Sequence, residues 1–587
     1  MKFTNRLALA LMLSMATPKL HADPQLDSWF TTYSGKYARI YTSAANQASS
    51  NSVTTWSNGT QTQSTPAYSG VQEVDYSANW VYIRSTGFGS HIMGPWQSGF
   101  PNLPSNQKAF YRIPRTPTVP ATKSINGGGA IGYFVDGVSM FNSWDAFYWN
   151  GSADTGGAGN GGLWNRDAYV NEGATFDPAY AHQPQSGQYH YHANPPALRY
   201  FLGDSVTYNA ETGAYAENPA QPHHSPILGW VADGFPIYGP YGYSSASNSA
   251  SGIRRMVSGY ALRNGQSGTS NLTVTGRTTL PAWAGRAYNT NTTLTAANDG
   301  PAVSASYPLG RYMEDNDYLG DLGYTQGVDF DLDEYNGRYC VTPEFPNGTY
   351  AYFVAVNSSG TPVFPYNIGR AYKGSPTGGS VTTLSETVTT NFLGGTNVPM
   401  KLNSPAINGG TVTLTWSAIE GGTYQVQGTS DFSSWTVLAT NIPAQLITGT
   451  TNVTSTNAMQ FFRVARTAVA AFDPVSGTTT GGGGGNGILS VSPTSHARGT
   501  SFTLTINLDP AATPAPPPQN APINSVTVGA ITGTGNVHVS QTQVTSVITI
   551  PANATTGAQT VTVVFPGPPQ NPSQTVTYTL PGGFTIN

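Results

Sequence analysis

The sequence predicts an all-β protein in which a large β-rich domain is followed by two small β-sandwich domains. At 587 residues the chain is too long for one ordinary hydrophobic core. Charged residues make up 9% of the chain, against about 25% in typical soluble domains, and glycine alone occupies 67 positions. Short runs that alternate apolar and polar residues between turn residues recur towards the C-terminus and are typical of β-strands.

Residues 1–22 have the pattern of a secretory signal peptide. Lys2 and Arg6 precede an apolar run at 7–15, and the small residue Ala22 closes the segment. The run is too short to span a bilayer, which needs about 20 apolar residues. We therefore expect an exported protein without a transmembrane segment, either secreted, periplasmic or held at the cell surface.

The charge balance limits the possible partners. The formal net charge is −4, and lysine and arginine are not clustered anywhere in the chain. A nucleic-acid ligand requires clustered cations that displace counterions, so we expect no nucleic-acid partner. Extracellular polysaccharide or cell-surface components are the remaining candidates. Trp144, Trp149 and Trp164 lie near loops rich in Gly and Asn, and they either stack on sugars or anchor a core.

Residues 23–375 form the first expected domain, which holds most of the aromatic residues. Residues 132–141 resemble residues 229–238, because both runs place an Asp-Gly pair, at Asp136 and Asp233, between two apolar segments. Asp-Gly favours a tight hairpin, since glycine adopts positive φ without strain. The two hairpins indicate either a duplicated β core or a chance similarity.

Two segments of low complexity are expected to be linkers between domains. Residues 376–397 are rich in Thr, Gly and Ser, and residues 471–487 include five consecutive glycines at 481–485. Both compositions are typical of flexible connections.

The two remaining segments predict small sandwiches, whose default role is spacing or attachment. Residues 398–470 resemble a fibronectin type III-like module, and residues 488–587, which open on Val491-Ser-Pro493, resemble an immunoglobulin-like IPT module. The positions that carry the first likeness are Trp416, Tyr424, Trp435 and Phe462.

The strongest chemical signal is the run Tyr189-His190-Tyr191-His192. Alternate side chains of a strand share one face, so the two histidines project together and the two tyrosines project to the opposite side. Two neutral imidazoles at this spacing can hold one transition metal ion such as copper or zinc. The alternative is a polar strand face whose histidines only bond their neighbours.

A second pair, His223 and His224, follows about thirty residues later. Adjacent side chains point in opposite directions along an extended chain, so one member of this pair is expected to join His190 and His192. Asp136 and Asp233, at the hairpin tips, are weaker candidates for carboxylates that hydrogen-bond the metal-binding histidines and orient them.

The combination of these motifs resembles the YHYH family. Besides the four residues from Tyr189 to His192, the likeness rests on the runs at 224–229, 233–242, 332–337 and 342–353, and it covers most of residues 125–370. The resemblance implies no settled activity, and the motif positions that it marks are Tyr189, His190, Tyr191 and His192. Related sequences often carry a Cys and a Gly-His pair just upstream. Here that region offers His182 and no Cys, so either His182 replaces the ligand or the site is smaller.

An acidic run predicts a different kind of site. Asp329, Asp331 and Asp333 share one face of an extended strand. Crowded carboxylates repel one another unless a cation neutralises them, and calcium, which prefers oxygen ligands, fits this need. The alternative is pairing with Arg311 and Arg338 at the surface.

Cys340 is the single cysteine, so no disulfide forms within the chain. It is expected to be either buried and inert or a soft metal ligand or reactive thiol.

Three functions fit the sequence. The first is an exported protein that binds a transition metal through the histidine cluster. The second is a secreted metal-dependent hydrolase or oxidase that acts on an extracellular polymer. The third is a non-catalytic adhesive or structural protein of the cell surface.

Overall fold

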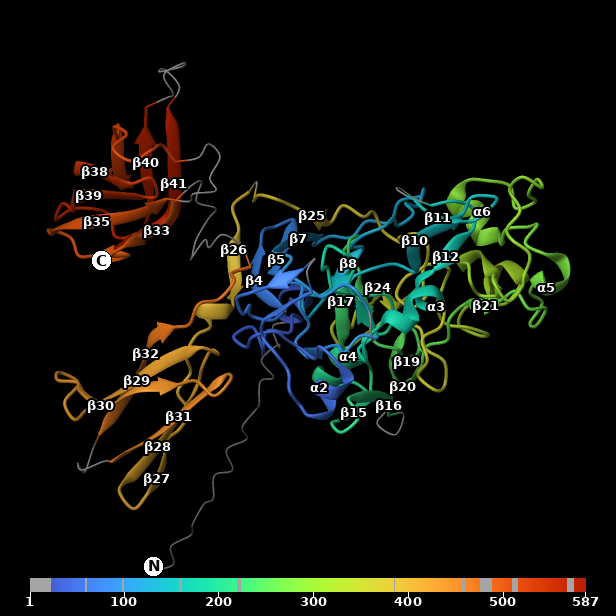
Figure 1. Cartoon of the computed structure of the whole chain (residues 1–587), viewed down its shortest axis with the longest axis horizontal. Coiled ribbons are helices and arrows are strands. Elements are labelled where there is room, and N and C mark those ends of the chain that lie inside the picture. The colour runs from blue at the N-terminus through green and yellow to red at the C-terminus, as the bar shows by residue number, and fades with distance from the viewer. Residues whose placement is uncertain are drawn as a thin grey trace, which may run out of the picture.

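The computed structural model describes residues 23–58, 61–97, 100–157, 161–218, 223–384, 386–454, 460–475, 488–508, 516–566 and 575–587. The expected signal peptide and residues 476–487 of the glycine-rich stretch lie outside the described residues. Strands dominate and helices are short, which confirms the all-β prediction (Figure 1). Among the described helices, none has the length and apolar character needed to cross a membrane.

An eight-stranded sheet lies at the centre of the first domain. Its hydrophobic core contains buried residues from each of the eight strands, including Phe134, Trp230 and Phe353. In spatial order the strands are β13 (Ala181–His182), β14 (His190–Tyr191), β9 (Ser139–Met140), β8 (Gly132–Phe134), β17 (Ile227–Val231), β18 (Pro236–Tyr238), β24 (Thr349–Phe353) and β23 (Gly337–Cys340).

The two halves of this sheet repeat the same pattern. Each half contains an Asp-Gly hairpin, β8–β9 or β17–β18, and the hairpins meet where β8 pairs antiparallel with β17. A parallel strand follows each hairpin, with Tyr191 opposite Met140 and Tyr352 opposite Ile237. An antiparallel edge strand completes each half. The pattern supports the duplicated β core rather than a chance similarity.

Equivalent side chains make equivalent bonds in the two halves. The Tyr191 hydroxyl donates to Asp136 Oδ2 at 3.2 Å, and the Tyr352 hydroxyl donates to Asp233 Oδ2 at 2.6 Å. With Tyr191 and Tyr352 aligned, Ala351 and Phe353 of the second half occupy the places of His190 and His192. Arg338 pairs with Ala351 as His182 pairs with His190. The histidines are therefore a feature of one half only.

A five-stranded sheet packs beside the first and includes residues that we expected to be a linker. Two edge strands of this sheet, β25 and β26, come from residues 376–397 and pair with β7 and β4. The backbone hydrogen bonds of these edges extend the first domain beyond residue 375. In order, the strands are β25 (Gly379–Ser380), β7 (Ala109–Pro114), β5 (Trp80–Ser85), β4 (Val71–Tyr76) and β26 (Thr389–Leu393).

The remaining elements of the first domain are short ribbons, a small sheet and helices. The small sheet, β11 (Asp154–Gly156), β10 (Trp144–Trp149) and β12 (Asn165–Asp167), lies over a second core that contains Trp144 and Trp164. Trp149 packs partly buried against the same core, so the three tryptophans anchor a core. The two-stranded ribbons are β1 (Arg39–Ile40) with β6 (Ile92–Met93), β2 (Trp56–Ser57) with β3 (Thr62–Gln63), β15 (Val206–Asn209) with β16 (Ala214–Glu217), β19 (Tyr241–Ser245) with β20 (Asn248–Arg255), and β21 (Tyr260–Leu262) with β22 (Asn316–Tyr318). The helices are α1 (Pro24–Asp27), α2 (Ala44–Ala48), α3 (Ala168–Glu172), α4 (Pro196–Phe201), α5 (Leu272–Thr275) and α6 (Ala282–Tyr288), with 3₁₀ turns η1 (Gly173–Thr175), η2 (Met313–Asp315), η3 (Leu319–Leu322) and η4 (Gly395–Asn397).

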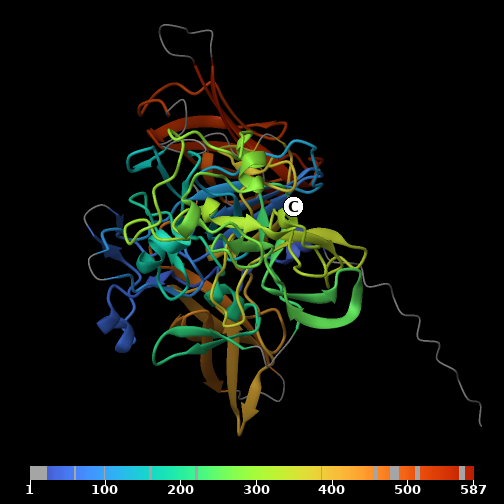
Figure 2. The ribbon, with the colours of Figure 1, turned by 90° about the vertical axis from the view of Figure 1, so that its right-hand side faces the viewer.

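The C-terminal segments form two β-sandwiches, drawn in orange and red (Figures 1 and 2). Each has its own core, around Trp416 in the first and around Phe565 in the second. The first packs β27 (Ala406–Asn408), β28 (Thr411–Ser417) and β31 (Thr448–Thr454) against β30 (Thr436–Pro443), β29 (Gly422–Thr429) and β32 (Phe461–Val469). The second packs β33 (Ile488–Ser492), β35 (Ser501–Leu508), β39 (Gln543–Thr549) and β38 (Thr534–Ser540) against β34 (Ser495–His496), β41 (Val576–Ile586), β40 (Gly557–Phe565), β36 (Ser525–Val528) and β37 (Ile531–Thr532).

The first sandwich is fastened to the large domain. Ile419 packs against Tyr37 and Tyr68 in a small buried cluster. Glu420 accepts a hydrogen bond from the backbone N–H of Tyr37 at 2.8 Å and forms a salt bridge with Arg39. These contacts join residues almost 400 positions apart in the chain.

Candidate metal centre

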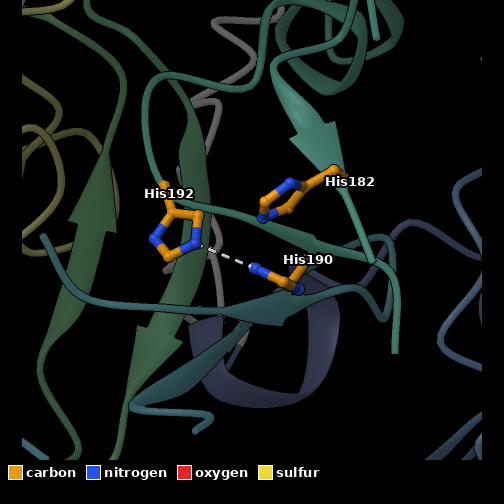
Figure 3. Close-up of side chains that lie close together, drawn as sticks. All are labelled: His182, His190 and His192. Atoms are coloured by element: carbon orange, nitrogen blue, oxygen red, sulfur yellow. Dashed lines mark hydrogen bonds between the residues drawn. The ribbon is translucent and has the colours of Figure 1, made fainter. Parts of the chain in front are cut away.

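Three histidines converge at one rim of the eight-stranded sheet. His182 of β13 lies directly opposite His190 of β14 in an antiparallel pair, and His192 follows two residues later. Cross-strand partners share a face, as do residues two apart on a strand. The rings therefore point towards one another (Figure 3), and all three residues are at most 7% exposed.

Backbone carbonyls orient two of the rings. His190 Nδ1 lies 2.8 Å from the Gln188 carbonyl oxygen, and His192 Nδ1 lies 2.7 Å from the Asn142 carbonyl oxygen. A carbonyl only accepts hydrogen bonds, so each Nδ1 must carry the proton that it donates. In the neutral rings, each Nε2 then presents a lone pair.

A hydroxyl orients the third ring in the same way. Thr175 Oγ1 donates its single proton to the Glu172 carbonyl oxygen at 2.7 Å. The hydroxyl oxygen must therefore accept from His182 Nδ1, which lies 2.7 Å away. All three neutral rings thus offer Nε2 as the free nitrogen.

The ligand atoms of the three rings form a group that could hold one metal ion. Among the described residues, these three histidines form the group whose ligand atoms all lie within 4.8 Å of one another. Two nitrogens on a tetrahedral zinc ion, each about 2.0–2.1 Å from it, are roughly 3.4 Å apart. The Nε2 atoms of His190 and His192 are 2.9 Å apart, and two lone pairs at that distance need a positive charge between them, either a proton or a metal ion.

Burial favours the neutral, metal-binding form of two rings. It lowers the pKa of His182 to about 4 and the pKa of His190 well below its ordinary value. Burial also acts to lower the pKa of His192, but the hydrogen bond and charge of Glu172 outweigh it, and the net shift is upward. These directions of the pKa shifts favour His192 over His182 and His190 as the ring that takes up a proton.

Glu172 is a residue of the site that the sequence did not reveal. Its Oε2 lies 3.3 Å from His192 Nε2 and 3.6 Å from His182 Nε2. Burial acts to raise the pKa of Glu172, but contact with His192 leaves that pKa below its ordinary value. Glu172 ends helix α3, whose N-cap Asp167 accepts from the Val170 N–H. No periodicity or motif marks this carboxylate, because only the packing of α3 brings it to the rings.

A pocket opens onto the histidines. It has a volume of about 290 Å³, and His182, His190, His192 and Glu172 form part of its wall. The side of the cluster that faces this pocket is accessible to a small ligand, as in metal sites that keep one coordination position for water or substrate.

The motif tyrosines hold the strand from the opposite face. Tyr189 and Tyr191 are fully buried. The Tyr189 hydroxyl donates to Asp177 Oδ2 at 2.7 Å, while Tyr191 donates to Asp136. Asp136 therefore holds Tyr191 in place and makes no hydrogen bond to a histidine among the described residues, so the expectation that it supports the candidate ligands His190 and His192 directly is wrong.

Neither His223 nor His224 joins the cluster. The His223 side chain is 43% exposed and lies 3.7 Å from Asp204. His224 packs against the rings of Tyr238 and Tyr243, and its Nδ1 donates to the Ser225 carbonyl oxygen. The third ring of the cluster comes from β13 instead, because antiparallel pairing brings His182 opposite His190.

Asp233 repeats the role of Asp136 in the second half of the sheet. It accepts from the Tyr352 hydroxyl and from the Gly374 N–H at 2.9 Å. Its carboxylate supports the second half of the duplicated scaffold. Among the described residues, it makes no hydrogen bond to the three histidines.

The acidic run does not form the calcium site that we expected. Asp331 forms salt bridges with Arg254 and Arg338, whereas Asp333 pairs with Lys373 Nζ at 3.0 Å. Asp329 is exposed and caps a local turn at Thr325. Protein cations neutralise Asp331 and Asp333, and in the described part of the chain the acidic run forms no group that could hold a metal ion. Cys340, the other candidate ligand, is buried and free, and burial raises the pKa of its thiol.

Comparison with known proteins places the centre within a recognised segment. Residues 110–364 match the family model described as YHYH protein. The matched segment contains all three histidines, Glu172 and both hairpins. No curated protein matches the chain.

Proposed function

We propose that the YHYH segment, residues 110–364, binds one transition metal ion through His182, His190 and His192. The observation that carries the proposal is the convergence of three Nε2 atoms whose partner nitrogens are all committed as donors. Metal-ligating histidines in proteins are fixed in this way by their second nitrogen. Three neutral nitrogen donors suit zinc or copper.

Metal content of the purified protein tests this proposal. We expect about one zinc or copper ion per chain by mass spectrometry, and well under one in a His190→Ala/His192→Ala variant. His223→Ala is the matched control, because it removes an exposed histidine outside the cluster. Equal metal content in the cluster variant and the control, or a metal-free wild-type protein, would contradict the proposal.

The open pocket supports a second candidate, a metal-dependent hydrolase or oxidase. The carboxylate of Glu172 lies 3.3 Å from His192 Nε2, beside the accessible face of the cluster. A carboxylate in that position can accept a proton from water or substrate. Turnover of an extracellular polymer that persists in Glu172→Gln, or that survives loss of the metal, would argue against this candidate.

The proposal includes export and an accessory role for the C-terminal sandwiches. The pattern of residues 1–22 supports export. The two sandwiches, with separate cores and few charges, suit spacing or attachment at the cell surface. Fractionation of cells that express the full chain, with and without residues 1–22, tests the export part directly.

A further inference from the structure

We infer that one face of the large domain binds an extended polypeptide segment that carries several lysine or arginine side chains. The face consists of an apolar groove and an adjoining stripe of exposed aromatic rings. Neither part contains a residue of the histidine cluster, so binding at this face does not depend on the proposed metal.

The groove lies between α1, the end of α4, the start of β17 and the segment that follows β23. Its volume of about 350 Å³ is within the range of small-ligand sites, at about 300–1,000 Å³. A wall of prolines and aliphatic side chains suits the methylene stem of a long side chain. The apolar lining residues are Pro24, Leu202, Pro226, Ile227 and Pro343.

The charges of the groove are all negative. Its charged lining residues are Asp27 and Glu344, and neither forms an ion pair within the described part of the chain. Glu344 accepts a hydrogen bond from the Tyr238 hydroxyl at 2.9 Å, which leaves its charge in place. No lysine or arginine lines the groove among the described residues. Two carboxylates without a cation beside them favour a positively charged occupant, and lysine and arginine combine such a charge with an apolar stem.

A stripe of six aromatic side chains adjoins the groove, because Leu202 of the groove wall directly follows Phe201 of the stripe. The stripe continues from α4 to the β15–β16 ribbon, which lies beside that helix (Figure 1). The ring centres of Tyr200 and Tyr208 are 5.7 Å apart, and those of Tyr208 and Tyr215 are 4.8 Å apart. None of the six side chains is buried, and Tyr200 and Tyr208 are 41% and 38% exposed. The members of the stripe are Phe30, Tyr33, Tyr200, Phe201, Tyr208 and Tyr215.

The aromatic stripe favours the same kind of partner as the groove. The faces of aromatic rings are electron-rich and attract cations. One cation of the protein itself already lies on the stripe, since Lys36 Nζ is 4.7 Å from the ring centre of Tyr33. Contiguous exposed apolar surface is typical of interaction sites. A partner that reaches both the groove and the rings must be extended, so a polypeptide with several cations fits this face better than a small amine.

Binding of labelled peptides to the full chain, measured by fluorescence anisotropy, tests the inference. Three peptides of equal length alternate alanine with lysine, with glutamine or with glutamate. We expect saturable binding of the lysine peptide that weakens as salt is added, about tenfold weaker binding of the glutamine peptide, and no binding of the glutamate peptide. Equal binding of the lysine and glutamine peptides, no binding of the lysine peptide, or its displacement by a neutral β-glucan would overturn the inference.

A double variant connects the binding to the groove. Asp27→Asn/Glu344→Gln removes both carboxylate charges and should weaken binding of the lysine peptide by about three- to tenfold, because each exposed ion pair contributes little. The matched control is Asp329→Asn/Asp431→Asn, which removes two charges from exposed carboxylates outside the groove and the stripe. It should change the affinity by less than about twofold. An equal loss in both double variants would show that net charge alone attracts the peptide, and would overturn the inference.

A second double variant tests the aromatic stripe. Tyr200→Leu/Tyr208→Leu keeps apolar side chains at both positions but removes the ring faces, and it should weaken binding of the lysine peptide by about two- to fivefold. Tyr324→Leu is the control, since Tyr324 is 36% exposed and lies outside the stripe and the groove. Wild-type affinity in the double variant would contradict a role for the stripe.

Discussion

One hydroxyl decides which nitrogen of His182 faces the cluster. Thr175 passes its proton to a carbonyl and so can only accept from His182 Nδ1. Thr175→Val keeps the shape of the side chain but leaves His182 free to rotate or change tautomer. We expect zinc affinity to fall by about 10- to 100-fold, the usual effect of losing a group that orients a ligand. Competition with a chelator measures the change.

Thr175→Ser is the matched control for this prediction. It retains the hydroxyl and should restore most of the affinity lost in the valine variant. Equal affinity of the valine variant and wild type would show that Thr175 does not orient His182.

The buried carboxyl of Asp136 predicts a dependence of stability on pH. Burial raises its pKa from the ordinary 3.8 to about 7. Because the pKa is raised in the folded protein, protonation of Asp136 stabilises the fold. This contribution is complete below about pH 4 and is lost as the pH rises through about 7. Asp136→Asn carries no charge at any pH and keeps an acceptor for Tyr191. The melting temperature of the variant minus that of wild type should therefore rise between about pH 4 and pH 7 and level off above that.

Asp233→Asn extends this test to the other half of the sheet. Burial raises the pKa of Asp233 to about 6, so the rise should level off at a lower pH and its total size should be smaller. A difference in melting temperature that stays constant with pH in both variants would contradict the assignment.

Among the elements, helix α3 links the stability of the fold to the proposed metal site. Its N-cap, Asp167, accepts from the Val170 N–H at 3.0 Å and from the Tyr366 hydroxyl at 2.9 Å. Asp167→Ala should cost about 1–3 kcal/mol of unfolding free energy. Because α3 ends at Glu172, the same variant should also weaken zinc binding. Denaturation and zinc titration measure the two effects.

Ser43→Ala separates the effect of losing a helix cap from an effect on the proposed metal site. Ser43 is the N-cap of α2, a helix without buried residues, and accepts from the Asn46 N–H at 3.2 Å. We expect a smaller loss of stability there and unchanged zinc affinity. If both cap variants left zinc binding intact, α3 would not position Glu172 for the site.

Local patterns predicted the strand of the motif, whereas the rest of the site depends on packing. The spacing of His190 and His192 placed both on one face, and the Asp-Gly pairs identified the two hairpins. The position of His182 opposite His190 depends on how the loop between β13 and β14 folds. The length of that loop does not by itself determine which residues of the two strands pair. Glu172 and Thr175 reach the rings through α3 and η1, which no sequence signal ties to the motif.

The fold shows the same dependence on packing in residues 376–397, which we predicted to be a linker. Strands β25 and β26 have two and five residues, and their Thr, Gly and Ser content is typical of a loop. They become strands because β7 and β4 offer open edges to pair with. A single sequence shows the composition of residues 376–397. It does not show that β7 and β4 have open edges with which these residues can pair.

For the molecule as a whole, the contact at Glu420 should couple the unfolding of two domains. Glu420 accepts from the Tyr37 N–H and pairs with Arg39, and both charged side chains are 15% exposed. Glu420→Gln removes the charge that Arg39 neutralises, and should weaken this contact by about 1–3 kcal/mol. We expect calorimetry to resolve an earlier transition for the first sandwich. A single transition that shifts as a whole would argue against the contact as the main coupling.

The repeated halves of the central sheet have one more consequence. The rim that carries Arg338, Ala351 and Phe353 follows the same backbone plan as the rim that carries His182, His190 and His192. The rim without histidines therefore serves as an internal control. Comparing the two rims shows how much three crowded imidazoles destabilise a rim with the same backbone arrangement. Hydrogen exchange at the two rims, compared within one sample before and after metal is added, would report that cost without any substitution.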